Sequence, residues 1–156
     1  MEITQQADYA VRAVLELALR PEGARVPSDE IAGAQDISPS FLTKILTRLS
    51  AQGICSTQRG VNGGVKLSRA ASAICLLDVI EAIDGPITLN RCARHPSDCA
   101  RDHVCAVHPI WIELCADLRT KLASYTFDYI AQRARAASLP GQTITLYEEL
   151  PIRKKT

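Results

Sequence analysis

The chain has 156 residues, of which 47% are apolar, and its formal net charge at pH 7 is +1. A chain of this length forms one domain of roughly 100 to 200 residues, and its apolar content supplies a core, which excludes a largely disordered protein. Because 18 basic residues are balanced by 17 acidic ones, the chain as a whole has no field that attracts DNA or anionic lipid. Any such attraction must come from local clusters of charge.

Neither a secretory signal nor a membrane helix is predicted. The first 20 residues contain charged side chains at five positions, Glu2, Asp8, Arg12, Glu16 and Arg20. These charges interrupt the apolar stretch that a signal peptide needs, and no window approaches the roughly 18 apolar residues of a membrane-spanning helix. We therefore expect a cytoplasmic protein with no membrane partner. In that compartment the six cysteines are expected to be reduced.

Three helices are predicted in the first third of the chain. Apolar residues recur at intervals of three and four over residues 5–20, which is typical of an amphipathic helix. A second helix is expected over roughly 29–35, with Ser28 as its N-cap. Ser38, as N-cap before a proline at the first helical position, marks the start of a third helix over about 39–52. The polar face of this third helix carries Ser40, Thr43, Lys44, Thr47 and Arg48.

A β-hairpin is predicted after the third helix. Ile54–Thr57 and Val65–Leu67 have the composition of short strands, and a glycine-rich turn that includes Arg59 and Asn62 lies between them. Three helices followed by a hairpin is the order of a winged helix-turn-helix, in which the third helix enters the major groove of DNA. The predicted fold class is therefore mainly α with a small β-hairpin wing, and the winged helix-turn-helix spans residues 1–84.

Local charge also favours DNA binding. Between Ile37 and Leu77 there are five basic residues and no acidic one, a local charge of 5 − 0 = +5. An ordinary solvated helix face also carries Lys and Arg, but the acid-free run, the neighbouring hydroxyl groups and an arginine at a glycine-rich tip together favour DNA. The turn lacks the G-x-x-x-x-G-K-[ST] spacing of a nucleotide-binding loop. The candidate DNA-binding residues are Ser38, Ser40, Thr43, Lys44, Arg48, Arg59 and Asn62.

The second half of the chain is predicted to be helical around one cysteine-bearing loop. Leu76–Ile83 reads as a short helix and residues 85–105 as a loop. From 106 to 124 apolar residues step by threes and fours, namely Val107, Trp111, Leu114, Leu118 and Leu122. We expect this long helix to form a homodimer, with packing onto the chain's own first helix as the alternative. A short helix completes the region 106–137, and residues 138–156 are expected to be a flexible tail.

Three of the six cysteines are clustered in the predicted loop. Cys92-x6-Cys99-x5-Cys105 is followed one helical turn later by His108. Thiolates bind soft or borderline metals, and one imidazole or carboxylate completes a set of four ligands. An iron–sulfur cluster, a structural zinc ion and redox-sensing bare thiols are all compatible with this pattern. Three crowded thiols argue against the single nucleophilic cysteine of an enzyme. The other cysteines are expected to be small buried residues, at Cys55, Cys75 and Cys115.

Several of these segments resemble one known family. The matching parts are Met1–Thr4, Asp8–Ala13, Ile37–Leu42, the turn Arg59–Gly64, and the three clustered cysteines with His108 and Trp111. Over about residues 1–135 the chain resembles the winged-helix iron–sulfur transcription regulators of the IscR/NsrR type. The resemblance implies a homodimeric bacterial transcription regulator in which Cys92, Cys99 and Cys105 hold a 2Fe-2S or 4Fe-4S cluster. It also implies that affinity for a roughly palindromic DNA operator depends on the cluster.

Two positions limit what the resemblance implies. A glutamate on the recognition helix of IscR takes part in operator choice, and Thr43 stands in its place here, so operator specificity cannot be transferred. The fourth cluster ligand is ambiguous, because His108 matches the histidine of the 2Fe-2S cluster in IscR and Asp8 matches the carboxylate of the 4Fe-4S cluster in NsrR. His108 is favoured because it reaches Cys105 without a long-range contact, and Asp8 is the alternative.

Overall fold

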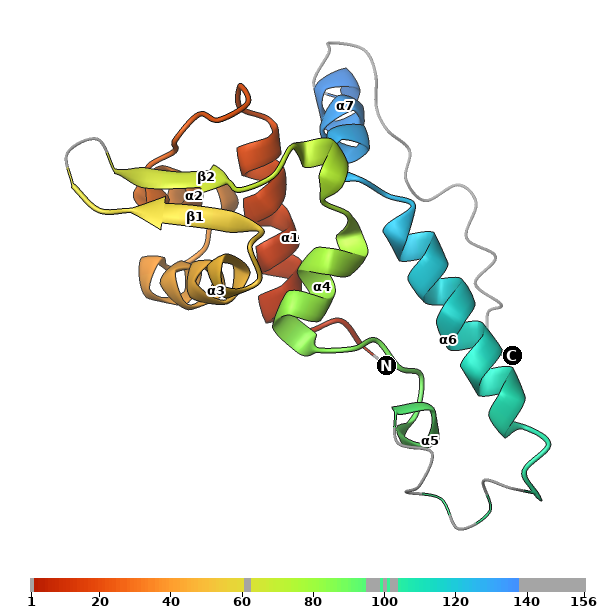
Figure 1. Cartoon of the computed structure of the whole chain (residues 1–156). Helices are drawn as coiled ribbons and strands as arrows, with labels where there is room; N and C mark the ends of the chain where they lie inside the picture. Colours follow the sequence, from red (N-terminus) through yellow and green to blue (C-terminus); the bar gives the residue numbers. More distant parts are fainter. Residues whose placement is uncertain (1, 61–62, 95–98, 100, 102–103, 138–156) are drawn as a thin grey trace, which may run out of the picture.

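The computed structural model describes residues 2–60, 63–94, 99, 101 and 104–137. Its first half consists of α1 (Gln5–Ala18), α2 (Ser28–Gln35), α3 (Pro39–Ala51), β1 (Cys55–Gln58) and β2 (Gly64–Leu67). Its second half consists of the 3-10 helix η1 (Ala71–Ala73), α4 (Leu76–Asp84), α5 (Arg91–Arg94), α6 (His108–Ala123) and α7 (Phe127–Ala137). Figure 1 shows α3 and the hairpin on one side, α6 on the other, and α4 between them. The predicted class, mainly α with a β-hairpin wing, is confirmed.

α1 is the central helix of the winged half. Its N-cap Thr4 accepts a hydrogen bond from the backbone N–H of Ala7 through Oγ1, at 3.2 Å. The face toward the core is rich in alanine, and its buried residues are Ala7, Ala10, Ala13, Val14, Leu17 and Ala18. Because alanine side chains are small, neighbouring helices approach this face closely, and α2, α3, α4 and α7 all pack against α1.

α3 has the two-sided character that its sequence predicts. Pro39 occupies the first turn, and the buried residues are Leu42, Ile45, Leu46 and Leu49. The polar residues that were predicted to face outward, from Ser40 to Arg48, are exposed. Ser38 is the N-cap by position, yet its side chain makes no capping hydrogen bond. Ser28 was predicted as the N-cap of α2, but α2 begins at Ser28 and Pro27 holds the cap position.

β1 and β2 form an antiparallel hairpin, the wing, whose base is fixed to the segment between α1 and α2. Val26 of that segment pairs with Val65, and each N–H donates to the other carbonyl at 2.9 and 2.8 Å. The tip requires glycine, because a Cβ at Gly63 would collide with the backbone oxygen of Gln58. Gly64 has a φ of 142°, and a Cβ there would lie 2.8 Å from the Val26 oxygen.

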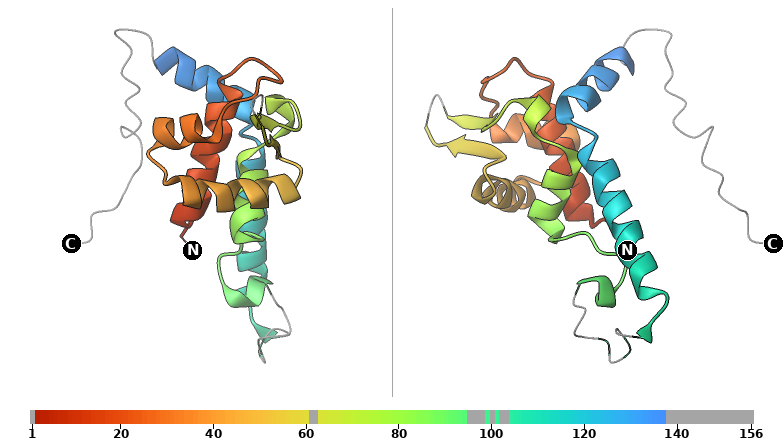
Figure 2. Two further views of the ribbon diagram at one scale, coloured as in Figure 1. Left: turned by 90° about the vertical axis from the view of Figure 1, so that its left-hand side faces the viewer. Right: turned by 45° about the vertical axis from the view of Figure 1, so that its right-hand side comes forward.

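The wing is followed by helices that return to α1 and then extend away from it. α7 packs on α1 and η1 through Phe127, which is fully buried. The junction between α6 and α7 is attached to the start of α4, because Leu76 N–H donates to Tyr125 O and Phe127 N–H to Ile74 O, both at 2.9 Å. The first half of α6 extends with α5 beyond the winged half (Figure 2).

α6 matches the predicted dimerisation helix in position. It packs against α4 and α5, and Cys115 is its one buried residue. Five large apolar residues at its start or just before it are exposed, namely Val107, Ile110, Trp111, Ile112 and Leu114. The alternative, in which α1 covers this stripe, is therefore wrong for the first half of the helix. In the part of the chain that is described, no helix is long and apolar enough to cross a membrane.

The predicted loop 85–105 contains more regular structure than its sequence indicates. Arg91–Arg94 form the one-turn helix α5, and the Asn90 side chain accepts a hydrogen bond from Ala93 N–H at 3.0 Å. One turn is too short to produce a visible period, so the pattern gave no signal. The predicted flexible tail, 138–156, lies outside the described residues.

Candidate DNA interface and cysteine site

The side predicted to face DNA is formed by α3, the wing and the start of α2. These elements border a groove of about 630 Å³, which Thr43 and Thr47 line from α3, Ser28 from α2 and Arg59 from the end of β1. Arg59 directly follows β1 and is exposed. The predicted contact Asn62 lies outside the described residues. The structure therefore brings the predicted recognition helix and the wing arginine to one groove.

Hydrogen bonds divide the polar face of α3 into two kinds of side chain. Thr43 Oγ1 donates to Pro39 O and Thr47 Oγ1 donates to Thr43 O, both at 2.9 Å. Because these hydroxyl protons are used inside the helix, the two threonines are left with lone pairs that accept hydrogen bonds. Ser40 and Lys44 are exposed on the same face, and Lys44 supplies its positive charge.

Arg48 has a contact that the sequence pattern did not indicate. Its Nη1 donates to the Ile83 carbonyl in the last turn of α4, at 2.8 Å. A cation at the carbonyl end of a helix is favoured by the helix dipole. Arg48 therefore joins α3 to α4, in addition to its predicted place on the outward face.

The end of α2 is held by a second arginine that sequence reasoning missed. Arg12 of α1 donates from Nε to Gln35 Oε1 at 3.1 Å and from Nη2 to Gln35 O. Asp36, which follows, is the C-cap in the left-handed region with a φ of 52°. Asp8 lies 4.0 Å from Arg12 as an i,i+4 ion pair. These contacts fix the turn between α2 and α3, and so orient the recognition helix.

The clustered cysteines are free and half-buried. Cys92, Cys99 and Cys105 form no disulfide, and Cys92 Sγ lies 3.3 Å from Asn90 Oδ1. His108 begins α6, and its backbone N–H donates to Cys105 O at 3.2 Å, so Cys105 lies one turn before the first residue of the helix. Among the described residues, no three His, Cys, Asp or Glu side chains come together as a metal site. The donor chemistry nevertheless fits, because thiolates are the usual ligands of iron–sulfur clusters.

The other three cysteines occupy separate places. Cys55 and Cys115 are buried as predicted, whereas Cys75 is half-buried. Burial raises the pKa of the Cys55 thiol, and desolvation likewise raises the pKa of Cys75. Both groups are therefore neutral thiols at neutral pH, which makes them poor nucleophiles and poor ligands.

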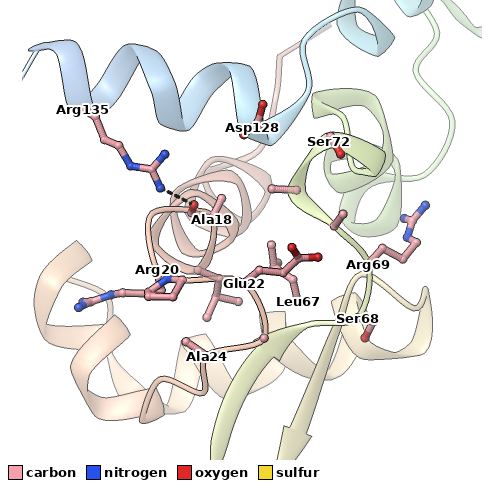
Figure 3. A pocket seen from close by; sticks show the side chains of 15 residues that line it. Ala18, Arg20, Glu22, Ala24, Leu67, Ser68, Arg69, Ser72, Asp128 and Arg135 are labelled. Carbon is pink, nitrogen blue, oxygen red and sulfur yellow. Dashed lines mark hydrogen bonds between the residues drawn. The ribbon is translucent and has the colours of Figure 1, made fainter.

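A second hollow, of about 450 Å³, lies between the end of α1, the root of the wing and α7. Arg135 of α7 lies on one side of it, and its Nη2 donates to Ala18 O at 3.2 Å (Figure 3). The same Nη2 also donates to Leu19 O at 3.2 Å. These carbonyls are in the last turn of α1, where cationic side chains are favoured. The hollow shares no lining residue with the groove between α3 and the wing, and its arginine serves as a cap for α1.

A winged helix whose third helix and wing carry basic residues and no acidic one is the architecture of a sequence-reading DNA-binding protein. Comparison with known proteins identifies the family to which this DNA-binding protein belongs. The model of the Rrf2 family, described as an iron-dependent transcriptional regulator, matches residues 3–133. The chain belongs to the Rrf2 family of DNA-binding transcriptional regulators, and its relatives are regulators and not enzymes.

The similar proteins include two named regulators, IscR and CymR. The chain is 32% identical over 145 residues to the HTH-type transcriptional regulator IscR of Escherichia coli O1:K1, covering 93% of this chain and 89% of that protein. The solved structure of T. potens IscR is similar with a TM-score of 0.71 at 20% identity, over 91% and 94% of the two chains. CymR, described as the global cysteine regulator of B. subtilis, has a TM-score of 0.72 at 23% identity, over 85% and 98%. These structural likenesses confirm the fold.

Proposed function

We propose that this Rrf2-family regulator is a cytoplasmic homodimer whose binding to a roughly palindromic operator is controlled by an iron–sulfur cluster. The observation that carries the proposal is the set of three free, half-buried thiols, Cys92, Cys99 and Cys105, in the part of the chain that precedes α6. Their order matches the pattern of IscR, to which the chain is 32% identical. When bound, such a cluster supplies a redox- and ligand-sensitive group; the chain supplies its thiolates and the helix that follows.

The dimer is supported by the exposed face of α6. Ile110 is 52% exposed, Leu114 43% and Trp111 36%, and together with Val107 they lie at intervals of three and four on one helix face. Contiguous exposed apolar residues of this size mark an interaction surface. A two-fold dimer through this face would place two recognition helices on successive turns of DNA, which is the reason for a palindromic operator.

A second candidate keeps the DNA-binding role and replaces the cluster with bare redox-sensing thiols or a structural zinc ion. The thiol version is kept because the three thiols are free and because the chain shares its fold with CymR, which is described as a cysteine regulator. Anaerobic reconstitution with iron and sulfide, followed by native mass spectrometry, separates the candidates. We expect a mass that corresponds to a dimer with bound iron and sulfur, and visible absorption from thiolate-to-iron charge transfer. Cys92→Ala should abolish both, whereas the matched control Cys75→Ala should keep both; a colourless zinc-loaded or metal-free dimer would refute the cluster.

The fourth ligand is tested by single substitutions. We expect His108→Ala to lose the wild-type visible spectrum, because His108 follows Cys105 by about one helical turn and its imidazole can complete the ligand set without a long-range contact. Asp8 lies on α1, exposed and paired with Arg12, and Asp8→Ala should keep the spectrum. Loss of the spectrum in Asp8→Ala alone would assign the carboxylate instead, and an unchanged spectrum in both would exclude these two ligands.

The wing arginine is expected to contribute to operator affinity. Arg59 is exposed beside the groove between α3 and the wing, and we expect it to enter a narrow minor groove of the operator. Arg59→Ala should weaken specific binding by about 1 to 3 kcal/mol, measured by fluorescence anisotropy at fixed salt. Arg25→Ala, which removes an exposed arginine from the loop after α1, is the matched control. Equal affinities for the wild type and Arg59→Ala would remove Arg59 from the interface.

A further inference from the structure

We infer that Glu81 of α4 is a positioning residue that couples the segment 87–92, here called the cysteine segment, to α3, the predicted recognition helix. Through this coupling, binding or loss of the cluster would change DNA affinity. The inference rests on the proposed function, since it concerns how that site acts on DNA binding. Three connections meet in the last turn of α4: one from the cysteine segment, one from α6 and one from α3. Glu81 makes the first two, and the Ile83 carbonyl makes the third.

One carboxylate oxygen of Glu81 holds two elements together. Glu81 Oε1 accepts a hydrogen bond from Ile87 N–H at 2.9 Å and also accepts one from Nη1 of Arg119 in α6. The Glu81 side chain is only 23% exposed, so these charge-assisted bonds are partly shielded from water. A shift of α6 or of the backbone at Ile87 therefore acts directly on Glu81.

Hydrogen bonds involve several residues between Ile87 and Cys92. Leu89 N–H donates to Cys115 Sγ in α6 at 3.3 Å. The Asn90 side chain accepts from Ala93 N–H at 3.0 Å, and it also contacts Cys92 Sγ. Only 92 − 87 = 5 positions separate the Glu81-bound amide from the first thiol. The segment is thus bonded to α6 at Leu89, and the Asn90 side chain ties the first turn of α5 to the residues before it. We therefore expect a displacement of Cys92 to move this short segment and the Ile87 amide with it.

The last turn of α4 carries the connection onward to DNA. Ile83, two residues after Glu81, accepts through its carbonyl from Arg48 of α3 at 2.8 Å. Asp84 accepts from Thr4 at the start of α1, at 2.6 Å from Oγ1 and 3.1 Å from N–H. α4 thus holds both the recognition helix and the N-terminus of α1 by its final residues. A rigid element that both sites bias in this way is a physical basis for coupling.

The measurement is the ratio of operator dissociation constants for the iron-free and iron-loaded dimer. We expect a wild-type ratio that departs from 1 by at least about 5-fold, the lower end of typical coupling, and a ratio within about 2-fold of 1 for Glu81→Gln. Iron content should be unchanged and the thermal midpoint only slightly lower, because Gln keeps an acceptor oxygen for Ile87 N–H and loses only the charge that strengthens the bond to Arg119. Arg119→Gln removes the same pair from the other side and should give the same result. Glu22→Gln, an exposed acid in the loop after α1, is the control and should retain the wild-type ratio.

The wild-type ratio tests the proposed regulation, and the ratios of the two variants test the role of Glu81. A wild-type ratio of 1 would overturn the proposed regulation, and the role of Glu81 with it. A normal wild-type ratio that is retained in Glu81→Gln and Arg119→Gln would overturn only the role of Glu81. Hydrogen exchange adds a readout that a purely stabilising ion pair would not move: amides of α3 should differ between the two states in the wild type and be equal in Glu81→Gln.

Discussion

Replacing Leu114 with glutamate should give a folded monomer whose affinity for a palindromic operator is lower by about 100-fold or more. The size follows from the loss of the linked second half-site, since two joined binding units exceed either one by roughly 10² to 10⁴. Leu114 is 43% exposed, so the substitution costs the isolated chain little. In the proposed interface, however, it would bury an unpaired carboxylate, which is strongly unfavourable.

Leu114 is a better position for this substitution than the other leucines of the apolar stripe on α6, because it is more exposed. Leu118 and Leu122 are half-buried, so a charge there would also disturb contacts within the chain. Thr120→Glu, at an exposed position of the same helix, is the matched control and should remain dimeric. Light scattering coupled to size-exclusion chromatography gives the mass. A dimeric Leu114→Glu would place the interface on another surface.

Phe127→Ala should lower the free energy of unfolding by about 3 to 5 kcal/mol, the usual cost of removing a large buried aromatic side chain. Phe127 is 0% exposed, and its N–H is bonded to Ile74 O, so the cavity would open where α7 joins the winged half. Urea denaturation followed by circular dichroism measures the change. The control Gln132→Ala, at an exposed position on the same helix, should change stability by no more than about 0.5 kcal/mol. A small loss for Phe127→Ala would show that α7 is not part of the cooperative core.

The features that periodicity and turn chemistry determine could be predicted from the sequence. The apolar repeat of α3 predicted its buried and exposed faces, and the glycines of the wing predicted the hairpin, because Gly63 and Gly64 occupy positions that no side chain fits. The start of α6 was displaced from the prediction by two residues only. In each case the information is local, since it depends on residues within a few positions of each other.

The contacts that connect these elements could not be predicted. Arg48 is one of several polar residues on α3, and nothing in its spacing indicates that Ile83 O lies within reach. Arg12 and Gln35 are 23 positions apart, and Glu81 and Arg119 are 38 apart. Such bonds depend on the angles at which helices pack, which the hydrophobic pattern does not specify. The choice between His108 and Asp8 is of the same kind, because it requires the relative placement of distant elements.

The cap that α7 places on α1 has a consequence for how this protein can be recombined. Arg135 donates to Ala18 O across 117 positions of sequence, and Phe127 fills the core beside the same helix. A chimera that joined residues 1–84 to the sensing half of an unrelated regulator would lose both partners and leave the end of α1 uncapped. The DNA-reading and sensing parts are therefore expected to be inherited and exchanged as one unit, with a substitution in α1 compensated in α7.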